Sequence, residues 1–344
     1  MLARTLSVIV LVLTLLTGVV LLTRVPLFPH EVASDRLAKQ EDRVRGETFF
    51  SGVLSRLSLL PGFRSHPQPF TIMVENQEDA RPYQEGLEAA LMVQEFLVEG
   101  FISRFAVIFD ARNIPREVGP VRSLRPYFLD GMAPWSRLVI HAGGSPEALD
   151  RVRDGSDFTA INLLYYDTDG SLRKVGPPAP HNVFLSREKI TELLNDAPEQ
   201  FVQSLDGPLF PVGRAHGGEP AEIVHVNFYN TEHNEVYEYL PLANKYKRTD
   251  GTVVSDARPS NLVVLEVPID SIGEYGRLFM TLNGRGKALL FHSGKAWEAH
   301  WSRQNFKEPF RITDSEGKDV PFTYGQIWMV VLPTMDRVTW KEAD

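Results

Sequence analysis

The segment 119–126, which reads GPVRSLRP, places arginines where they could bind an anion. Because proline is tolerated only in the first turn of a helix, Pro126 predicts a helix that begins near Ser123. Arg122 would then lie just outside that helix and Arg125 in its first turn. Free backbone N–H groups and the helix dipole favour anions there, and arginine adds forked donors. The segment is therefore a candidate phosphate- or carboxylate-binding site.

Structural ion pairs are the equal alternative for these arginines. If residues 93–99 form a strand, Glu95 and Glu99 share one face, and Arg104 follows on the next strand. The two carboxylates could serve as an acid and a base. The commoner explanation is a network in which they pair with Arg104 and the arginines of 119–126.

A glycine pair marks the second candidate, residues 141–146 (HAGGSP). A strand end, Gly143, Gly144 and a helix capped by Ser145 can together cradle an anion. The alternative is an ordinary turn that needs a positive φ at one glycine. His141 is more often a hydrogen-bonded structural histidine than a catalytic base.

The third candidate is His181 with Asn182, which follow a proline-rich loop. A histidine and an amide at a strand start could act as a base and its orienting partner, or they could cap the loop. An enzyme built on this sequence would use His141 or His181 as the base and Glu99 as an acid partner.

Mixed strands and helices must position these residues. The pattern predicts strands over 70–74, 102–109, 138–140 and 158–166, and helices over 121–132, 145–153 and 186–195, while 87–98 is ambiguous. A glycine-rich stretch, 213–220, predicts a domain boundary. Short strand-like runs separated by turn signals follow at 222–228, 236–240, 262–267, 278–282, 288–292 and 327–332. The fold class is therefore α+β, with a mixed α/β first domain and a mostly antiparallel β second domain.

Composition excludes several classes of protein. The chain has 344 residues, 36 Lys plus Arg against 44 Asp plus Glu, and a net charge of −8. A globally basic nucleic-acid binder is not expected. The absence of cysteine excludes disulfides, thiolate zinc sites, iron–sulfur clusters and a lipidated N-terminal cysteine. No motif for a metal or another cofactor is present, so none is expected.

Residues 5–23 carry no charge and are long enough to cross a bilayer as a helix. We expect an uncleaved single-pass anchor in residues 1–24; a cleaved signal peptide is the alternative. Either way the bulk of the chain lies outside the cytoplasm. The expected organisation is the anchor, a helical stalk over 25–66, the mixed α/β domain over 67–212 and the β-rich domain over 213–344.

Several segments in order resemble the YerB-like family of bacterial envelope proteins. They are MVEN at 73–76, VEG at 98–100, SRF at 103–105, GPVRS at 119–123, HAGGSP at 141–146, PHN at 180–182, YKR at 246–248 and GQIW at 325–328. The resemblance covers roughly 70–333 and implies a two-domain extracytoplasmic protein. It supplies no reaction and no catalytic residues. Many relatives carry a lipobox cysteine, which this chain lacks, so the predicted transmembrane helix must anchor it.

Three functions follow as hypotheses. The first is a membrane-anchored envelope protein that binds an anionic cell-wall ligand through Arg122, Arg125 and the turn at 143–145, with Ser123, Arg104 and Asn182 nearby. The second is a hydrolase or transferase acting on envelope polymers. The third is a scaffold that binds other envelope proteins.

Overall fold

The computed structural model describes residues 67–198, 204–272 and 276–343. The expected anchor and stalk lie outside these residues, so both stay predictions. Within the described residues, no helix has the length and apolar character needed to span a bilayer.

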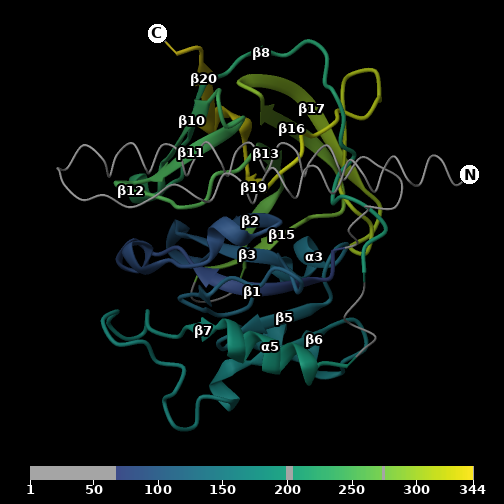
Figure 1. The fold of residues 1–344 in the computed structure, drawn as a ribbon. Helices are drawn as coiled ribbons and strands as arrows, with labels where there is room; N and C mark the ends of the chain where they lie inside the picture. Colours follow the sequence, from purple (N-terminus) through teal and green to yellow (C-terminus); the bar gives the residue numbers. More distant parts are fainter. Residues whose placement is uncertain (1–66, 199–203, 273–275, 344) are drawn as a thin grey trace, which may run out of the picture. The chain divides into compact units, whose positions relative to one another are not determined.

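One large sheet of eleven strands dominates the fold (Figure 1). Its main path runs β18-β17-β16-β13-β19-β2-β3-β1-β5-β6, and β8 pairs with β17. The strands are β1 (Pro69–Glu75), β2 (Met92–Leu97), β3 (Ser103–Asp110), β5 (Leu138–His141), β6 (Thr159–Asn162), β8 (Glu219–Pro220), β13 (Asn261–Glu266), β16 (Gly284–His292), β17 (Lys295–Arg303), β18 (Arg311–Thr313) and β19 (Ile327–Leu332). The central strands β1, β2, β3 and β19 are buried along their whole length, which explains their nearly continuous apolar sequences.

The large sheet draws strands from both sides of the predicted boundary at 213–220. β19 lies between β13 and β2 and is parallel to both. Residues of the first and last thirds of the chain therefore share one hydrogen-bonded sheet and one apolar core.

A second sheet has five strands in the order β12-β11-β10-β9-β20, and all its pairs are antiparallel. These strands are β9 (Ile223–Val226), β10 (Glu235–Leu240), β11 (Lys245–Asp250), β12 (Val253–Val254) and β20 (Val338–Lys341). Two short pairs join β4 (Glu117–Val118) to β7 (Leu185–Ser186) and β14 (Ile269–Ile272) to β15 (Arg277–Met280).

The described helices are short. The α-helices are α3 (Pro126–Met132), α4 (Pro146–Arg153) and α5 (Arg187–Asn195). The 3-10 helices are η1 (Glu78–Tyr83), η2 (Leu87–Ala89), η3 (Glu99–Phe101), η4 (Leu163–Tyr165), η6 (Thr231–His233) and η8 (Met335–Arg337). As predicted, Ser145 caps α4: its Oγ accepts a hydrogen bond from the N–H of Ala148 at 3.3 Å.

The helix predicted from Ser123 begins three residues later, at Pro126, with Arg125 as its N-cap residue. The residues before it are extended because their N–H groups pair with other segments. The N–H of Arg122 donates to the carbonyl of Met73, and that of Leu124 donates to the carbonyl of Gly143. The prediction that Arg125 lies in the first turn was wrong, because Arg125 is the N-cap residue and Arg122 and Ser123 lie in the extended segment before it.

Two other segments were refined. The ambiguous stretch 87–98 contains the strand β2 after the turn η2. The strand predicted over 158–166 stops at Asn162, because Asn162 caps η4 through a hydrogen bond from the N–H of Leu164 to its Oδ1.

Candidate functional site

All three guanidinium nitrogens of Arg125 are occupied by this chain. Nε and Nη2 donate to the two carboxylate oxygens of Glu99 at 2.7 and 2.9 Å, and Nη1 donates to the carbonyl of Leu124 at 2.9 Å. Burial raises the pKa of Glu99, but the hydrogen bond and charge of Arg125 outweigh it and hold that pKa below its ordinary value. Arg125 and Glu99 therefore form a structural ion pair, and Glu99 is a poor general acid.

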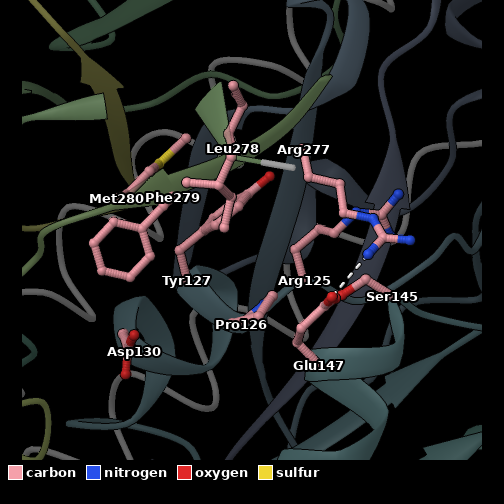
Figure 2. A pocket seen from close by; sticks show the side chains of 11 residues that line it. Arg125, Pro126, Tyr127, Asp130, Ser145, Glu147, Arg277, Leu278, Phe279 and Met280 are labelled. Atoms are coloured by element: carbon pink, nitrogen blue, oxygen red, sulfur yellow. Dashed lines mark hydrogen bonds and ion pairs between the residues drawn. The ribbon is translucent and has the colours of Figure 1, made fainter. Parts of the chain in front are cut away.

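Figure 2 shows the cavity beside this pair, lined by Arg125, Tyr127 and Ser145 on one side and by residues of β15 on the other. Its volume is about 60 Å³, which holds a few water molecules. Arg277 of β15 donates to Glu147 at 2.7 Å across its rim. The cavity is too small for an envelope polymer.

The glycine turn holds its neighbours together through its own backbone. The N–H of Gly143 donates to Oδ1 of Asn162 at 2.9 Å, and the N–H of Ser145 donates to the carbonyl of Leu124 at 3.1 Å. Gly143 has the predicted positive φ, 73°. Gly144 pairs with Leu124 in an isolated bridge. With two of its N–H groups occupied, the turn joins β5, η4 and the arginine segment.

His141 is completely buried at the end of β5. Its Nδ1 lies 2.7 Å from the carbonyl of Gly143, so Nδ1 carries the proton and donates. Burial lowers the pKa of His141 to about 4. A neutral, buried imidazole whose Nε2 has no partner among the described residues is a structural group.

Glu75, at the end of β1, contacts an arginine and a histidine at once. One of its carboxylate oxygens lies 2.8 Å from Nε of Arg122, and the other lies 2.8 Å from Nδ1 of His181. The Glu75 side chain is 2% exposed, whereas that of Arg122 is 23% exposed. Glu75 thus fixes Arg122 and His181 side by side, and it leaves Nη1 and Nη2 of Arg122 and Nε2 of His181 unused by the described part of the chain.

Arg104 adds a second arginine to this group. On β3 it lies opposite Glu75 in the register with β1, and its Nη1 donates to the carbonyl of Ser123 at 2.8 Å. Burial, together with the charges of Arg125 and Arg122, lowers the pKa of Arg104 to about 10. It stays protonated at neutral pH, and its buried Nε has no hydrogen-bond partner in the described ranges.

Asn182 supports the loop beside His181. Its Oδ1 accepts from Nη1 of Arg173 at 3.1 Å, and its carbonyl accepts from the N–H of Lys174 at 2.8 Å. The amide therefore orders the loop and does not orient the His181 ring, which Glu75 does. We call Glu75, Arg104, Arg122 and His181 the arginine site.

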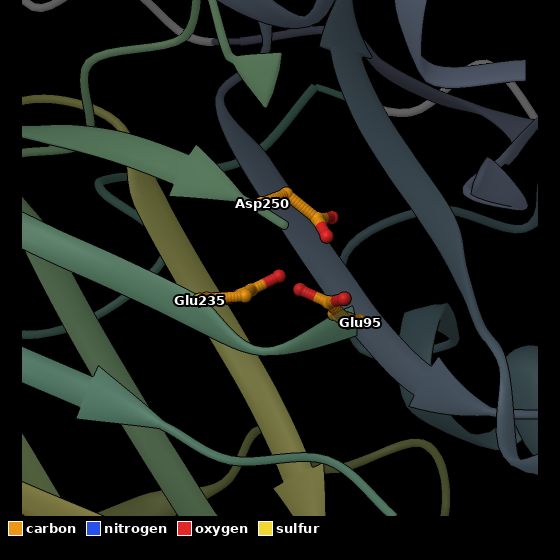
Figure 3. A group of neighbouring side chains, drawn as sticks. All are labelled: Glu95, Glu235 and Asp250. Carbon is orange, nitrogen blue, oxygen red and sulfur yellow. The ribbon is translucent and has the colours of Figure 1, made fainter. Parts of the chain in front are cut away.

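A second polar cluster is fully buried (Figure 3). Glu95 of β2, Glu235 of β10 and Asp250 of β11 approach one another with ligand oxygens within 4.8 Å. Nη2 of Arg248 lies 2.7 Å from Asp250 and 3.5 Å from Glu95, and it also donates to Glu235. A guanidinium thus takes the position that a metal ion would need.

Further groups complete this cluster. Asn76 donates to Asp250 at 2.7 Å, Trp328 donates to Glu95 at 2.8 Å, and Arg81 lies 3.1 Å from Asp250. Burial raises the pKa of Glu235 well above its ordinary value, beyond what the charge of Arg248 offsets. We call this group the buried network.

Sequence reasoning placed Glu95 with the wrong partners. It pairs with Arg248 and not with Arg104, Arg122 or Arg125. Glu75, the residue that organises the arginine site, appeared in the sequence analysis only as part of the segment 73–76. The acids of β10 and β11 were not predicted to belong to any site. The sequence signal that could have identified Glu75 is a glutamate at the end of an apolar strand, because a buried carboxylate needs a cationic partner.

The comparisons with known proteins match both halves of the chain. The family model described as "Protein of unknown function (DUF3048) N-terminal domain" matches residues 61–200, and the C-terminal domain of that family matches 224–329. The chain belongs to the DUF3048 family. This confirms the resemblance to the YerB-like family, and the buried network joins the two DUF3048 domains, since Glu95 lies in one and Arg248 in the other.

A member of the DUF3048 family from Bacillus subtilis strain 168, named "Putative lipoprotein YerB", is 31% identical over 288 residues. That match covers 80% of this chain and 85% of the relative. The crystal structure of Bacillus subtilis YerB superposes with a TM-score of 0.70 at 28% identity, over 82% of this chain and 97% of that one.

Proposed function

We propose that this DUF3048 protein is an envelope protein, anchored through residues 5–23, that binds an anionic ligand at the arginine site. The naming of its relative YerB as a lipoprotein supports the envelope location. The observation that carries the binding proposal is the position of Glu75, whose carboxylate lies 2.8 Å from Nε of Arg122 and 2.8 Å from Nδ1 of His181. Nη1 and Nη2 of Arg122 and Nε2 of His181 have no hydrogen-bond partner in the described part of the chain.

The electrostatics of the arginine site favour an anion. The guanidinium groups of Arg104 and Arg122 outnumber the one carboxylate of Glu75, so the group carries excess positive charge. Arginine forks recognise carboxylate and phosphate oxygens in pairs. A wider hollow of about 690 Å³ between β4 and the α5 cap is lined by four glutamates against Arg116 and Lys174, so it disfavours anions.

The same geometry supports a second candidate, a hydrolase or transferase. Nδ1 of His181 lies 2.8 Å from the Glu75 carboxylate, and a hydrogen bond donated from Nδ1 would leave Nε2 as a base. Arg122 and Arg104 would stabilise a developing oxyanion. His141 and Glu99, the other candidates from the sequence, have no part in it.

The binding proposal is tested by calorimetric titration of the full-length chain, in mild detergent, with inorganic phosphate and with acetate. Arg122→Met should weaken binding about tenfold or more, as expected for one charged hydrogen-bonding group. Arg153→Met is the matched control, because Arg153 is 74% exposed and pairs only with Asp150 of its own helix. Equal binding by all three chains, or none by the unmodified chain at millimolar anion, would overturn the proposal.

The enzymatic candidate needs its own readout. His181→Gln keeps a donor to Glu75 and removes the base, so it should abolish turnover of an envelope polymer, while Arg104 and Arg122 still bind the anion at reduced affinity. Unchanged turnover in that variant would remove His181 as a base.

A further inference from the structure

A continuous chain of contacts leaves the arginine site on one side through the glycine turn. Ser123, next to Arg122, donates from Oγ to the carbonyl of Ala142 at 3.0 Å. A Cβ atom placed on Gly143 would lie 3.6 Å from that Oγ and 3.2 Å from Cδ1 of Leu164. Leu164 in η4 therefore lies beside Ser123 with only Gly143 between them.

The same chain returns to the arginine site on the other side. Asp167, just after η4, accepts from Nε of Arg173 at 2.6 Å. Arg173 in turn donates to Asn182 at 3.1 Å, and Asn182 follows His181, which is bonded to Glu75. The contacts thus close into a ring that begins and ends at the arginine site.

One segment of this ring of contacts carries exposed apolar and aromatic side chains. Leu164, Tyr165 and Tyr166 are 51%, 76% and 50% exposed. Three successive large side chains on the surface are unusual, because burying each one would be favourable. No ring contact involves either tyrosine among the described residues.

We propose that this ring binds a saccharide that carries an acidic group, with the acid at Arg122 and Arg104 and a sugar ring on Tyr165 or Tyr166. The inference rests on the proposed anion site and names its ligand class. Tyrosine offers a flat apolar face for the C–H surface of a sugar and a polar tip for its hydroxyls.

The other groups of the ring suit a sugar better than a lipid chain. Arg173, with a 37% exposed side chain, and Asn182 offer hydrogen-bonding groups in the same ring of contacts. An acyl chain needs an apolar groove, whereas the ring alternates aromatic, amide and charged groups. A polymer of acidic sugars can lie across such an open surface.

The test compares four probes by calorimetry on the full-length chain: trigalacturonate, glucose 1-phosphate, neutral maltotriose and inorganic phosphate. The first two separate carboxylate from phosphate as the acidic group. We expect either or both acidic saccharides to bind more tightly than phosphate, and maltotriose to bind more weakly than the acidic saccharides.

The variants assign the two parts of the ligand. The double variant Tyr165→Ser, Tyr166→Ser should lose about tenfold in affinity for acidic saccharides and none for phosphate, since aromatic contacts contribute on the order of 1 kcal/mol each. Tyr324→Ser, at a tyrosine 48% exposed elsewhere, is the matched control. Arg122→Met should weaken both classes of probe.

The outcomes separate the two proposals. Phosphate binding that depends on Arg122, without any effect of the tyrosine variant on the saccharides, overturns the saccharide inference alone. Loss of Arg122 dependence for every probe overturns the anion site and the inference together. Equal affinity for maltotriose and trigalacturonate would also overturn the inference.

Discussion

Two consecutive residues at the end of β1 belong to two different polar clusters. Glu75 organises the arginine site, while Asn76 donates to Asp250 and Ser103 in the buried network, each at 2.7 Å. Both clusters consist of carboxylates that hold arginines. In the buried network the guanidinium of Arg248 is enclosed by three acids and by the ring of Trp328, 4.2 Å away. In the arginine site, Nη1 and Nη2 of Arg122 and Nε2 of His181 have no partner among the described residues. What separates a structural cluster from a binding site is therefore which atoms of the same residue types remain unpaired, and toward what.

The largest expected effect tests the structural side of this comparison. Arg248→Met leaves the three acids of the buried network with Arg81 as their one remaining guanidinium. We expect a loss of about 3–5 kcal/mol in the free energy of unfolding, since breaking a buried ion pair leaves an uncompensated charge. Urea denaturation of the full-length chain measures it, with Arg153→Met as the control. A loss below that of the control would show that the network does not stabilise the fold.

The next effect concerns His141, which joins the glycine turn to β5. Its pKa is about 4 when folded and 6.5 in a model peptide, so the unfolded chain binds more protons between these values. Stability therefore falls as the pH drops through that window. Between pH 7 and pH 5, His141→Asn, whose amide can still donate to Gly143, should lose about 2 kcal/mol less than the unmodified chain. Urea midpoints at the two pH values measure it; the exposed His300→Asn should keep the unmodified slope, and the same slope in both variants would contradict the assignment.

A smaller effect is expected at the arginine site. Arg122→Met removes one of the two partners of Glu75 and leaves His181 in place. The loss in unfolding free energy should be about 1.5 kcal/mol, less than for breaking a fully buried ion pair, because Glu75 keeps His181 as a partner. The same variant weakens anion binding. A loss as large as that of Arg248→Met would make Arg122 a structural residue and erase the difference between the clusters.

The smallest effect separates Arg125 from Arg122. Because Glu99 and Leu124 occupy all nitrogens of Arg125, Arg125→Met should cost about 1 kcal/mol of stability, as expected for a partly exposed ion pair. It should not change the affinity for phosphate. A tenfold weaker binding in this variant would return Arg125 to the ligand site.

Local signals in the sequence predicted the elements well. The period-two pattern identified β3, and the serine before α4 was recognised as a cap. Ser186, where the last helix was predicted to begin, caps α5: its Oγ accepts from the N–H of Lys189 at 3.3 Å. These features depend on residues within a few positions of one another. The start of α3 was missed because the extended backbone before it is fixed by Met73, a residue far away in the sequence.

The partners of the charged residues were out of reach for the same reason. Glu95 and Arg248 are in contact only because β2 and the second sheet pack together. No local pattern around either residue predicts this contact. The sequence placed the arginine segment and His181 among the candidates. It did not show that Glu75 joins them, because that contact spans β1 and a loop after a cis proline.

The position of β19 has a consequence for how the protein assembles. β2 pairs with β3, which follows it directly, but its other neighbour, β19, is made only after all the intervening strands. Until then, the apolar strand β2 has an open edge that can pair with any other extended chain. Contacts between such distant residues also close slowly. A nascent chain of this protein therefore exposes that edge until β19 is made, and C-terminal truncations that remove β19 should aggregate rather than yield a folded first half.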